Sequence, residues 1–271
     1  MNLNLSLPWA GRRALFRSSH LRFAGAIVFL CVWELAYRLE IVPERYFTGP
    51  VGVLQAFGAL LFDATFWSNQ LATMLRSIAG LAYGTVLGLA MALAGACAPV
   101  IGRALSPVVE LMRSLPPAAL VPLAIFSLGL GPSMFAFIVG FAVVWAVYLS
   151  AANALASTDK VLVAVGRSLG LSPIALLWRI RVPGALPETM TGVRIAAAQA
   201  LMATVAAEML AGQNGLGFML MDSAFTLQTD ITFALLLISG ANGALLSRAV
   251  VVVSSWSCRW HRKLSAHSGE V

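Results

Sequence analysis

Residues 158–187 read TDKVLVAVGRSLGLSPIALLWRIRVPGALP, and this stretch decides how the remainder of the sequence is interpreted. Basic residues outnumber acidic ones in it, within an otherwise apolar region: Lys160, Arg167, Arg179 and Arg181 against Asp159. Thr158 or Asp159 can cap a first helix, and Ser172-Pro173 can begin a second one. Gly170 lies between them, where a helix C-terminus often takes a left-handed residue. The stretch therefore predicts two short helices joined by a turn, in a loop outside the membrane.

Apolar residues in both expected helices follow the helical spacing of three and four. The residues that share a face are Leu162, Val165 and Leu169 in the first helix, and Ile174, Leu177, Trp178 and Arg181 in the second. Pro183 and Pro187 are expected to end the second helix, because proline lacks the backbone N–H that a helix interior needs. Each helix thus presents an apolar face.

The spacing within this loop resembles the cytoplasmic loop of permease subunits in binding-protein-dependent ABC importers. The family pattern is Glu-Ala-Ala, three residues, Gly, nine residues, Ile, one residue, Leu, Pro. Here nine residues separate Gly170 from Ile180, and Pro183 closes the pattern. The opening departs from it, because residues 164–166 read Ala-Val-Gly. The missing Glu at Ala164 removes one expected polar contact to the ATPase.

Three further segments, RSLG (167–170), PGALP (183–187) and VAAEML (205–210), resemble the nitrate, taurine and aliphatic sulfonate branch of these permeases. The resemblance extends from about Leu71 to the C-terminus. It implies that the loop binds an ATPase subunit through nine residues: Ala164, Gly166, Arg167, Gly170, Leu171, Ile174, Leu177, Ile180 and Pro183.

The composition independently predicts an all-α integral membrane protein. Of the 271 residues 59% are hydrophobic and 11% are charged, against about 25% charged residues in an ordinary soluble domain. The formal charge is +7, but the basic residues are scattered between apolar runs, so a nucleic-acid partner is not expected. The three cysteines, Cys31, Cys97 and Cys258, are expected to be buried thiols, without disulfide or metal spacing.

Apolar runs predict six membrane helices, at about 23–42, 77–102, 107–128, 132–153, 188–210 and 231–254. A signal peptide is the alternative for the first run, but no small-residue cleavage site follows promptly. Six crossings put segment 1–22, Arg103, loop 158–187 and tail 259–271 on one side, and that side holds most of the Lys and Arg residues. By the positive-inside rule, this side and both termini are cytoplasmic.

Small residues recur every four positions along 77–102: Gly80, Gly84, Gly88, Ala92 and Ala96. Such a stripe lets two membrane helices approach closely, although the sequence does not say whether the partner helix belongs to the same subunit. Pro116 and Pro117 lie inside the expected third helix, and they predict either a simple kink or a bent helix that lines the translocation path.

Charged residues within apolar segments are expected to face protein or water. Glu110 and Arg113 can pair locally, since they are three residues apart on one helix; Arg113 can alternatively attract substrate. Glu208, within VAAEML, is a candidate for a gate or for contact with a binding protein. The path is therefore assigned to Arg113, Pro116, Pro117 and Glu208.

No catalytic constellation and no ATP-binding Gly-Lys pair occur in the sequence, so energy must come from elsewhere. The resemblance implies a transport subunit without cofactor in a bacterial inner membrane, paired with a second copy. Two cytoplasmic ATPases and an extracytoplasmic binding protein would be its partners, and the substrate would be a small anion such as a sulfonate, taurine or nitrate. An ion-coupled secondary transporter and a membrane-embedded enzyme are the alternatives.

Overall fold

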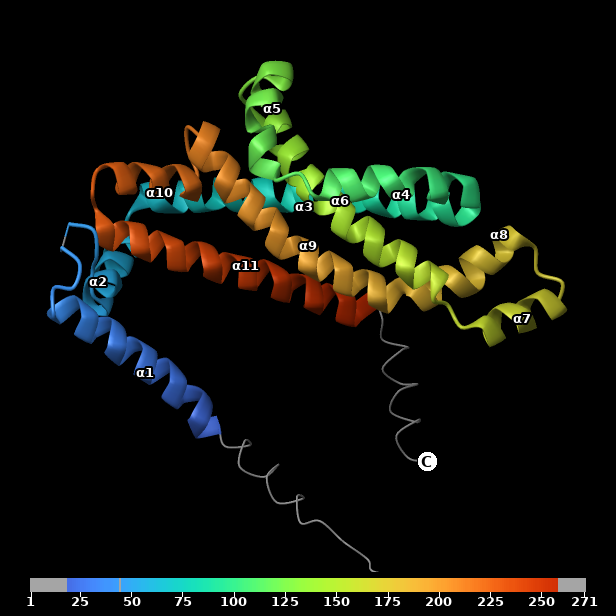
Figure 1. The fold of residues 1–271 in the computed structure, drawn as a ribbon, viewed down its shortest axis with the longest axis horizontal. Helices are drawn as coiled ribbons and strands as arrows, with labels where there is room; N and C mark the ends of the chain where they lie inside the picture. Colours follow the sequence, from blue (N-terminus) through green and yellow to red (C-terminus); the bar gives the residue numbers. More distant parts are fainter. Residues whose placement is uncertain (1–18, 44, 258–271) are drawn as a thin grey trace, which may run out of the picture.

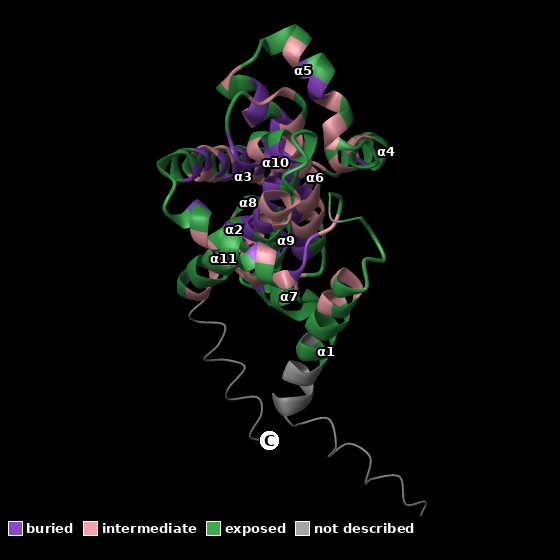
Figure 2. Cartoon of the chain, turned by 90° about the vertical axis from the view of Figure 1, so that its left-hand side faces the viewer, coloured by how far each residue is buried: buried purple, intermediate pink, exposed green. Residues whose placement is uncertain are grey.

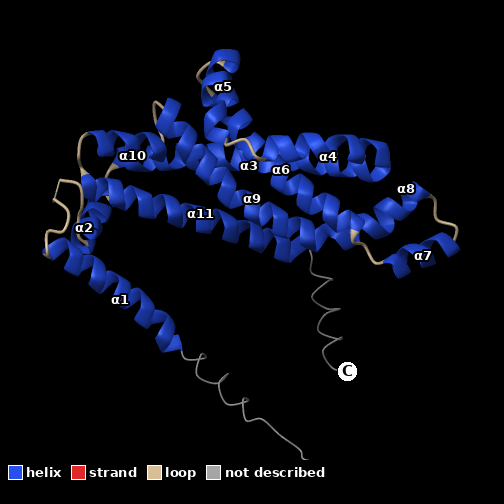
Figure 3. Cartoon of the chain, in the orientation of Figure 1, coloured by secondary structure: helices blue, strands red, loops and turns tan. Residues whose placement is uncertain are grey.

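The computed structural model describes residues 19–43 and 45–257, and this part of the chain contains helices, turns and loops but no strand (Figure 3). The elements are α1 (Ser19–Arg38), α2 (Pro50–Leu61), α3 (Ala64–Cys97), α4 (Pro99–Arg113), η2 (Pro117–Leu120), α5 (Val121–Leu128), α6 (Pro132–Ala156), α7 (Lys160–Ser168), α8 (Pro173–Leu176), η3 (Leu177–Arg181), α9 (Val182–Ala211), α10 (Leu216–Phe225) and α11 (Thr229–Ser257). Residues 1–18 of the expected N-terminal segment, Cys258 and the expected tail 259–271 lie outside the described residues.

The core of the molecule is built around α6. Its valines pack between α3 and α9, where the facing residues of α9 are mostly alanines, and α11 covers the far side of α9. Figure 2 shows the buried residues concentrated where these helices meet, and mostly exposed residues on α1 and α5. The small alanine side chains let α9 lie close to α6, which is how membrane helices gain van der Waals contact.

Four described segments are long and apolar enough to cross a membrane: α3, α6, Pro173–Ala211 and α11. The bent pair α4 and η2–α5 makes a fifth if it counts as one span. The remaining expected crossing, 23–42, overlaps α1, which begins and ends four residues earlier and in which Glu34 forms an ion pair with Arg38 at 2.7 Å. Six crossings therefore stay a prediction.

The expected starts of the second and third membrane helices are wrong, because capping signals earlier in the sequence begin these helices. The helix expected at 77–102 begins at Ala64, where Asp63 caps it by accepting the Thr65 N–H at 2.8 Å, and it ends at Cys97. The helix expected from 107 begins at Pro99, so Pro107 lies inside α4. Proline suits the first turn of a helix, and Pro99 occupies that place.

The helix expected at 107–128 is broken rather than kinked. It ends at Arg113, a short 3₁₀ turn follows from Pro117, and α5 continues at 90° to α4. Pro116 and Pro117 cannot donate the backbone hydrogen bonds that would carry the helix through this point. As a result α5 projects away from the other helices (Figure 1).

The expectation that Pro183 and Pro187 end a helix is also wrong. The helix runs without interruption from Pro173 to Ala211, so α8, η3 and α9 form one segment. Its residues 177–181 form a π turn, in which the Val182 N–H donates to the Leu177 carbonyl five residues back. A π turn accommodates one extra residue and shifts the hydrogen-bond pattern just before Pro183, which needs no N–H in the first turn of α9.

The loop 158–187 lies at one end of the molecule and α2 and α10 at the other (Figure 1). The C-terminal end of α6 and the end of α11 lie towards the end that carries the loop. The short helix α10, between α9 and α11, was not expected from the sequence. Cys31 and Cys97 are exposed on the isolated chain, contrary to the expectation of buried thiols.

The glycine stripe of α3 packs against α6 of the same chain. A Cβ added to Gly84 would lie 2.7 Å from both the Gly140 carbonyl oxygen and the Val143 Cβ. A Cβ on Gly88 would lie 2.7 Å from the Val144 carbonyl oxygen, and one on Gly80 would clash with Val139. Since these neighbours include backbone atoms, any side chain at Gly84 must push the two helices apart.

We expect Gly84→Leu to destabilise the protein by about 3 kcal/mol, because overpacking forces backbone shifts. Gly240→Leu on α11 is the matched control, since a Cβ at Gly240 meets nothing within 4 Å. The measurement is the thermal midpoint and the monodisperse yield of each variant in detergent. Equal stability of the two variants would contradict the packing of α3 on α6.

Candidate functional site: the 158–187 hairpin and the cavity at the α4–α5 bend

Each of the two helices of the 158–187 hairpin, α7 and α8, begins at a side-chain cap. The Asp159 carboxylate accepts the Val161 N–H at 2.8 Å, and the Ser172 hydroxyl accepts the Ala175 N–H at 3.3 Å. Each cap satisfies a backbone donor that has no partner inside its own helix. The caps thereby define where α7 and α8 begin.

The turn between α7 and α8 depends on Gly170, whose φ is +77°. The Leu171 N–H donates to the Gly166 carbonyl at 3.1 Å, and the Gly170 N–H donates to the Arg167 carbonyl at 2.9 Å. These two bonds form a Schellman motif, which closes a helix through one left-handed residue. Glycine adopts that conformation without a Cβ penalty.

Gly166 holds the two arms of the hairpin together. It is buried, and a Cβ there would lie 2.6 Å from both Leu176 Cδ2 and Ile180 Cδ1. The absence of a side chain thus lets α7 approach the α8–η3 segment closely. Leu177 is buried as well, in a cluster that includes Tyr148 of α6 and Ala185 of α9.

The outer face of the hairpin is apolar and exposed. Its residues are 50–76% accessible: Leu162, Val165, Leu169, Ile174 and Trp178. Of the nine residues predicted to bind the ATPase, Ala164, Arg167, Gly170 and Ile174 are exposed, whereas Gly166 and Leu177 are buried and Leu171, Ile180 and Pro183 are partly buried. The hairpin therefore combines a buried interior, which fixes its shape, with an exposed apolar face. Of the five residues that form this face, only Ile174 belongs to the nine predicted to bind the ATPase.

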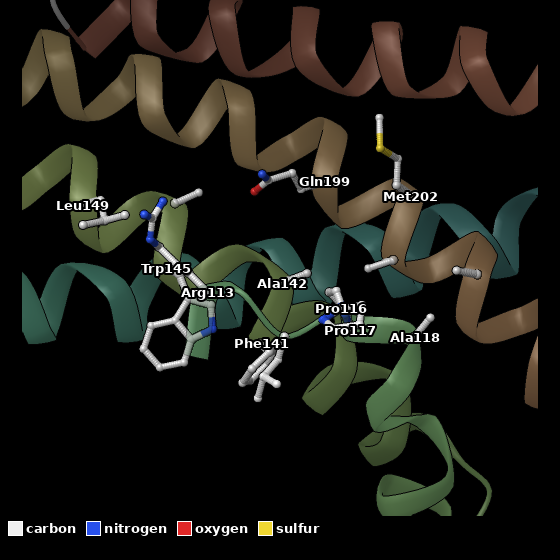
Figure 4. Close-up of a pocket in the computed structure, with 14 residues that line it drawn as sticks. Arg113, Pro116, Pro117, Ala118, Phe141, Ala142, Trp145, Leu149, Gln199 and Met202 are labelled. Atoms are coloured by element: carbon white, nitrogen blue, oxygen red, sulfur yellow. The ribbon is translucent and has the colours of Figure 1, made fainter. Parts of the chain in front are cut away.

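A cavity of about 560 Å³ lies at the α4–α5 bend (Figure 4). Residues of α4, η2, α6 and α9 line it, among them Arg113, Pro116, Pro117, Phe141, Trp145, Gln199 and Met202. Arg113 pairs with Glu110 at 2.6 Å, and both side chains are largely accessible. The cavity brings together three of the four residues assigned to the path, but Glu208 does not line it.

Glu208 instead has a fully buried side chain, which belongs to a polar network. Its carboxylate accepts hydrogen bonds from Arg76 Nη1 at 2.7 Å and from the Gly217 N–H at 3.0 Å. The Thr73 hydroxyl lies 2.8 Å from Glu208 Oε2 and itself accepts the Leu216 N–H at 2.8 Å. A buried carboxylate needs such partners, because desolvating it alone would be very costly.

This network joins α3, α9 and α10, and Arg76 extends it to α6. Arg76 also donates to the Asn214 carbonyl at 3.0 Å, and its guanidinium lies 4.1 Å from the centre of the Phe135 ring. The sequence does not reveal Arg76 as a partner, since 132 residues separate it from Glu208 and it lies just outside the helix expected at 77–102. A charge within an apolar helix did signal that Glu208 must have some partner.

A model of the binding-protein-dependent transport system inner membrane component family matches residues 84–257, which include the hairpin, the cavity and Glu208. The chain belongs to this family. It is thus a multi-pass permease subunit of a binding-protein-dependent ABC importer, as the resemblance implied.

Relatives of this permease include two from Escherichia coli strain K12. The taurine transport system permease protein TauC is 29% identical over 260 residues, or 94% of each chain. The putative aliphatic sulfonates transport permease protein SsuC is 28% identical over 232 residues, or 86% of this chain and 88% of the relative. A solved inward-facing structure of the MetNI methionine ABC transporter matches with a TM-score of 0.60 at 17% identity, covering 68% of this chain and 92% of the matched one. At that identity the likeness shows the fold alone.

We expect Glu208→Ala to lower the free energy of unfolding by about 3 kcal/mol, because it leaves the Arg76 charge without its partner. Arg76→Ala should destabilise the permease similarly, and the double variant should be less destabilised than the two losses added together. Thermal unfolding in detergent measures all three variants. Glu110→Ala is the control at an exposed pair, and it should leave the midpoint unchanged. Strict additivity of the two losses would contradict a direct Arg76–Glu208 interaction.

Proposed function

We propose that this chain forms the translocation path of an ATP-driven importer for small sulfonates such as taurine. The names of the two relatives from Escherichia coli support this substrate class. The observation that carries the proposal is the 158–187 hairpin, whose fixed interior and exposed apolar face suit docking to another protein. In the importer, two copies of the permease pair, two ATPases bind on the cytoplasmic side, and an extracytoplasmic binding protein delivers the substrate.

The ATPase covers the apolar outer face of the hairpin, in this proposal. Leu169 and Ile174 are 76% and 69% exposed, and burying such side chains contributes much of the energy of protein association. Arg167 and Arg179 are also exposed and can pair with acidic residues of the ATPase. Ala164 offers no polar group where the family pattern has Glu, so docking rests on the apolar contacts and the arginines.

Energy passes from the hairpin to the path through the uninterrupted helix Pro173–Ala211. One end of this helix forms an arm of the hairpin, and Gln199 and Met202 farther along it line the cavity. A displacement of the hairpin by the ATPases would therefore move a wall of the cavity. Nucleotide can switch access in this way only if the ATPases contact the hairpin differently in their two states.

The test uses Gly170, at which a β-branched residue is strained by roughly 1–3 kcal/mol because φ is positive. Gly170→Val should insert into the membrane in normal amounts, since the turn lies outside the bilayer. It should lose both the ATPase activity stimulated by loaded binding protein and the ATP-driven uptake of taurine into reconstituted vesicles. Gly170→Asn is the control, because Asn tolerates the left-handed conformation and should retain most of the uptake.

Full stimulation and uptake by Gly170→Val would show that energy does not enter through this hairpin. If the unmodified importer hydrolysed ATP but took up neither taurine nor alkyl sulfonates, the proposed substrate class would be wrong. Uptake without ATP, driven by an ion gradient, would instead support a secondary transporter.

A further inference from the structure

We propose that the cavity at the α4–α5 bend is a binding site for the sulfonate head group, formed by Arg113, Trp145 and Gln199. The inference rests on the proposed function for the identity of the natural substrate, but not for the existence of the site. It means that the permease itself selects for an anion, in addition to any selection by the binding protein. Figure 4 shows the three polar side chains, which come from α4, α6 and α9, among the residues that line the cavity.

Arg113 has one edge of its guanidinium available to a ligand. Its Nε and Nη2 donate to Glu110 at 2.9 and 2.6 Å, whereas Nη1 donates to none of the residues that the structure describes. The planar guanidinium can therefore keep its ion pair and still offer N–H groups to an anion. Arginine suits the head group because it donates two parallel hydrogen bonds to neighbouring oxygens of one anion.

Trp145 supplies a donor that lacks an acceptor. Its indole Nε1 is buried and has no hydrogen-bond partner among the described residues, although the side chain lines the cavity. An unsatisfied buried donor is unfavourable and calls for an explanation. Phe141 orients the indole by an edge-to-face contact at 5.4 Å between ring centres. The N–H is covered as the indole stands, so a rotation of the side chain toward the cavity would bring it to a bound sulfonate oxygen, which would satisfy it.

The remaining lining explains why the ligand is an organic anion. Among the residues that the structure describes, no acidic side chain lines the cavity, and Gln199 contributes a further amide donor. Most other lining residues are apolar, including Ala142, Leu149 and Met202. A cavity with convergent donors and apolar walls fits a small molecule with one anionic end and a short alkyl chain. Because the volume is about 560 Å³, a short alkyl sulfonate fits with room for water.

Glu110 lies outside the lining but competes with the ligand for Arg113. Its carboxylate occupies one edge of the guanidinium and lowers the positive charge that an anion meets. Removing the arginine should therefore weaken anion binding, whereas neutralising Glu110 should strengthen it. A merely structural ion pair would not give opposite effects on ligand affinity.

The experiment measures protection of a cysteine in the cavity. Met202→Cys is placed in a variant that lacks Cys31, Cys97 and Cys258, and the purified importer is alkylated with N-ethylmaleimide. At about ten times its Kd, ethanesulfonate should slow alkylation roughly tenfold, by the factor 1 + [L]/Kd. Ethanesulfonamide, which is neutral and similar in shape, should not slow it. Leu245→Cys on α11 is the control cysteine, exposed and away from the cavity lining.

Three substitutions test the assignment of the donors. Arg113→Gln should raise the Kd of ethanesulfonate by about tenfold or more, since it removes a charge-assisted contact. Trp145→Phe, which keeps the aromatic contact with Phe141, should raise it by roughly threefold or more. Glu110→Gln should lower the Kd.

Equal protection by ethanesulfonamide, no protection by ethanesulfonate, or an unchanged Kd in both Arg113→Gln and Trp145→Phe would overturn the site. The assay needs neither ATP nor the binding protein. An importer that fails to take up taurine but shows the expected protection would therefore contradict the proposed substrate and support the site.

Discussion

The uninterrupted helix from Pro173 to Ala211 is the constraint on which the rest of the structure depends. Two prolines, Pro183 and Pro187, would ordinarily end or kink a helix at this place. The π turn at residues 177–181 absorbs the altered hydrogen bonding, so the chain stays helical from the hairpin into the membrane core. The second arm of the hairpin thus shares one helix with the wall of the cavity.

Contacts along its length hold this helix in place. Near the hairpin, Leu177 and Ala185 pack in a buried cluster, and in the middle Ala196, Ala197 and Ala200 are fully buried in the core formed with α6. At the far end, the buried carboxylate of Glu208 joins the helix to α3 and α10. These contacts favour movement of the helix as a body over bending within it, since packed cores resist continuous deformation.

The sequence could predict the features that depend on local chemistry. The membrane class followed from composition. The turn at Gly170 followed from the place of this glycine, directly after the apolar pattern of the first helix, where a left-handed residue often ends a helix. Residues that act through distant partners could not be predicted in this way. The sequence does not show that Arg76 is the partner of Glu208, because the two are far apart in the chain. It also does not show that the Trp145 N–H lacks an acceptor, because this depends on how α4, α6 and α9 pack together.

The effects of Pro116 and Pro183 also differed, although both are prolines next to helices. The preceding π turn keeps the helix intact at Pro183, whereas the consecutive pair Pro116-Pro117 breaks it.

The most direct test of this account is a distance within one chain. Spin labels at Arg181, which is partly exposed and outside the docking face, and at Leu210, which is exposed, mark the two ends of the segment that contains both prolines, with only one copy of the permease labelled in each importer. At 1.5 Å per residue, 29 residues correspond to about 44 Å. We expect one narrow distance distribution that is the same without nucleotide and with bound ATP, because the helix moves as a body. A distance that shortens when ATP binds would show that the helix bends at its prolines, and that the hairpin moves independently of the cavity wall.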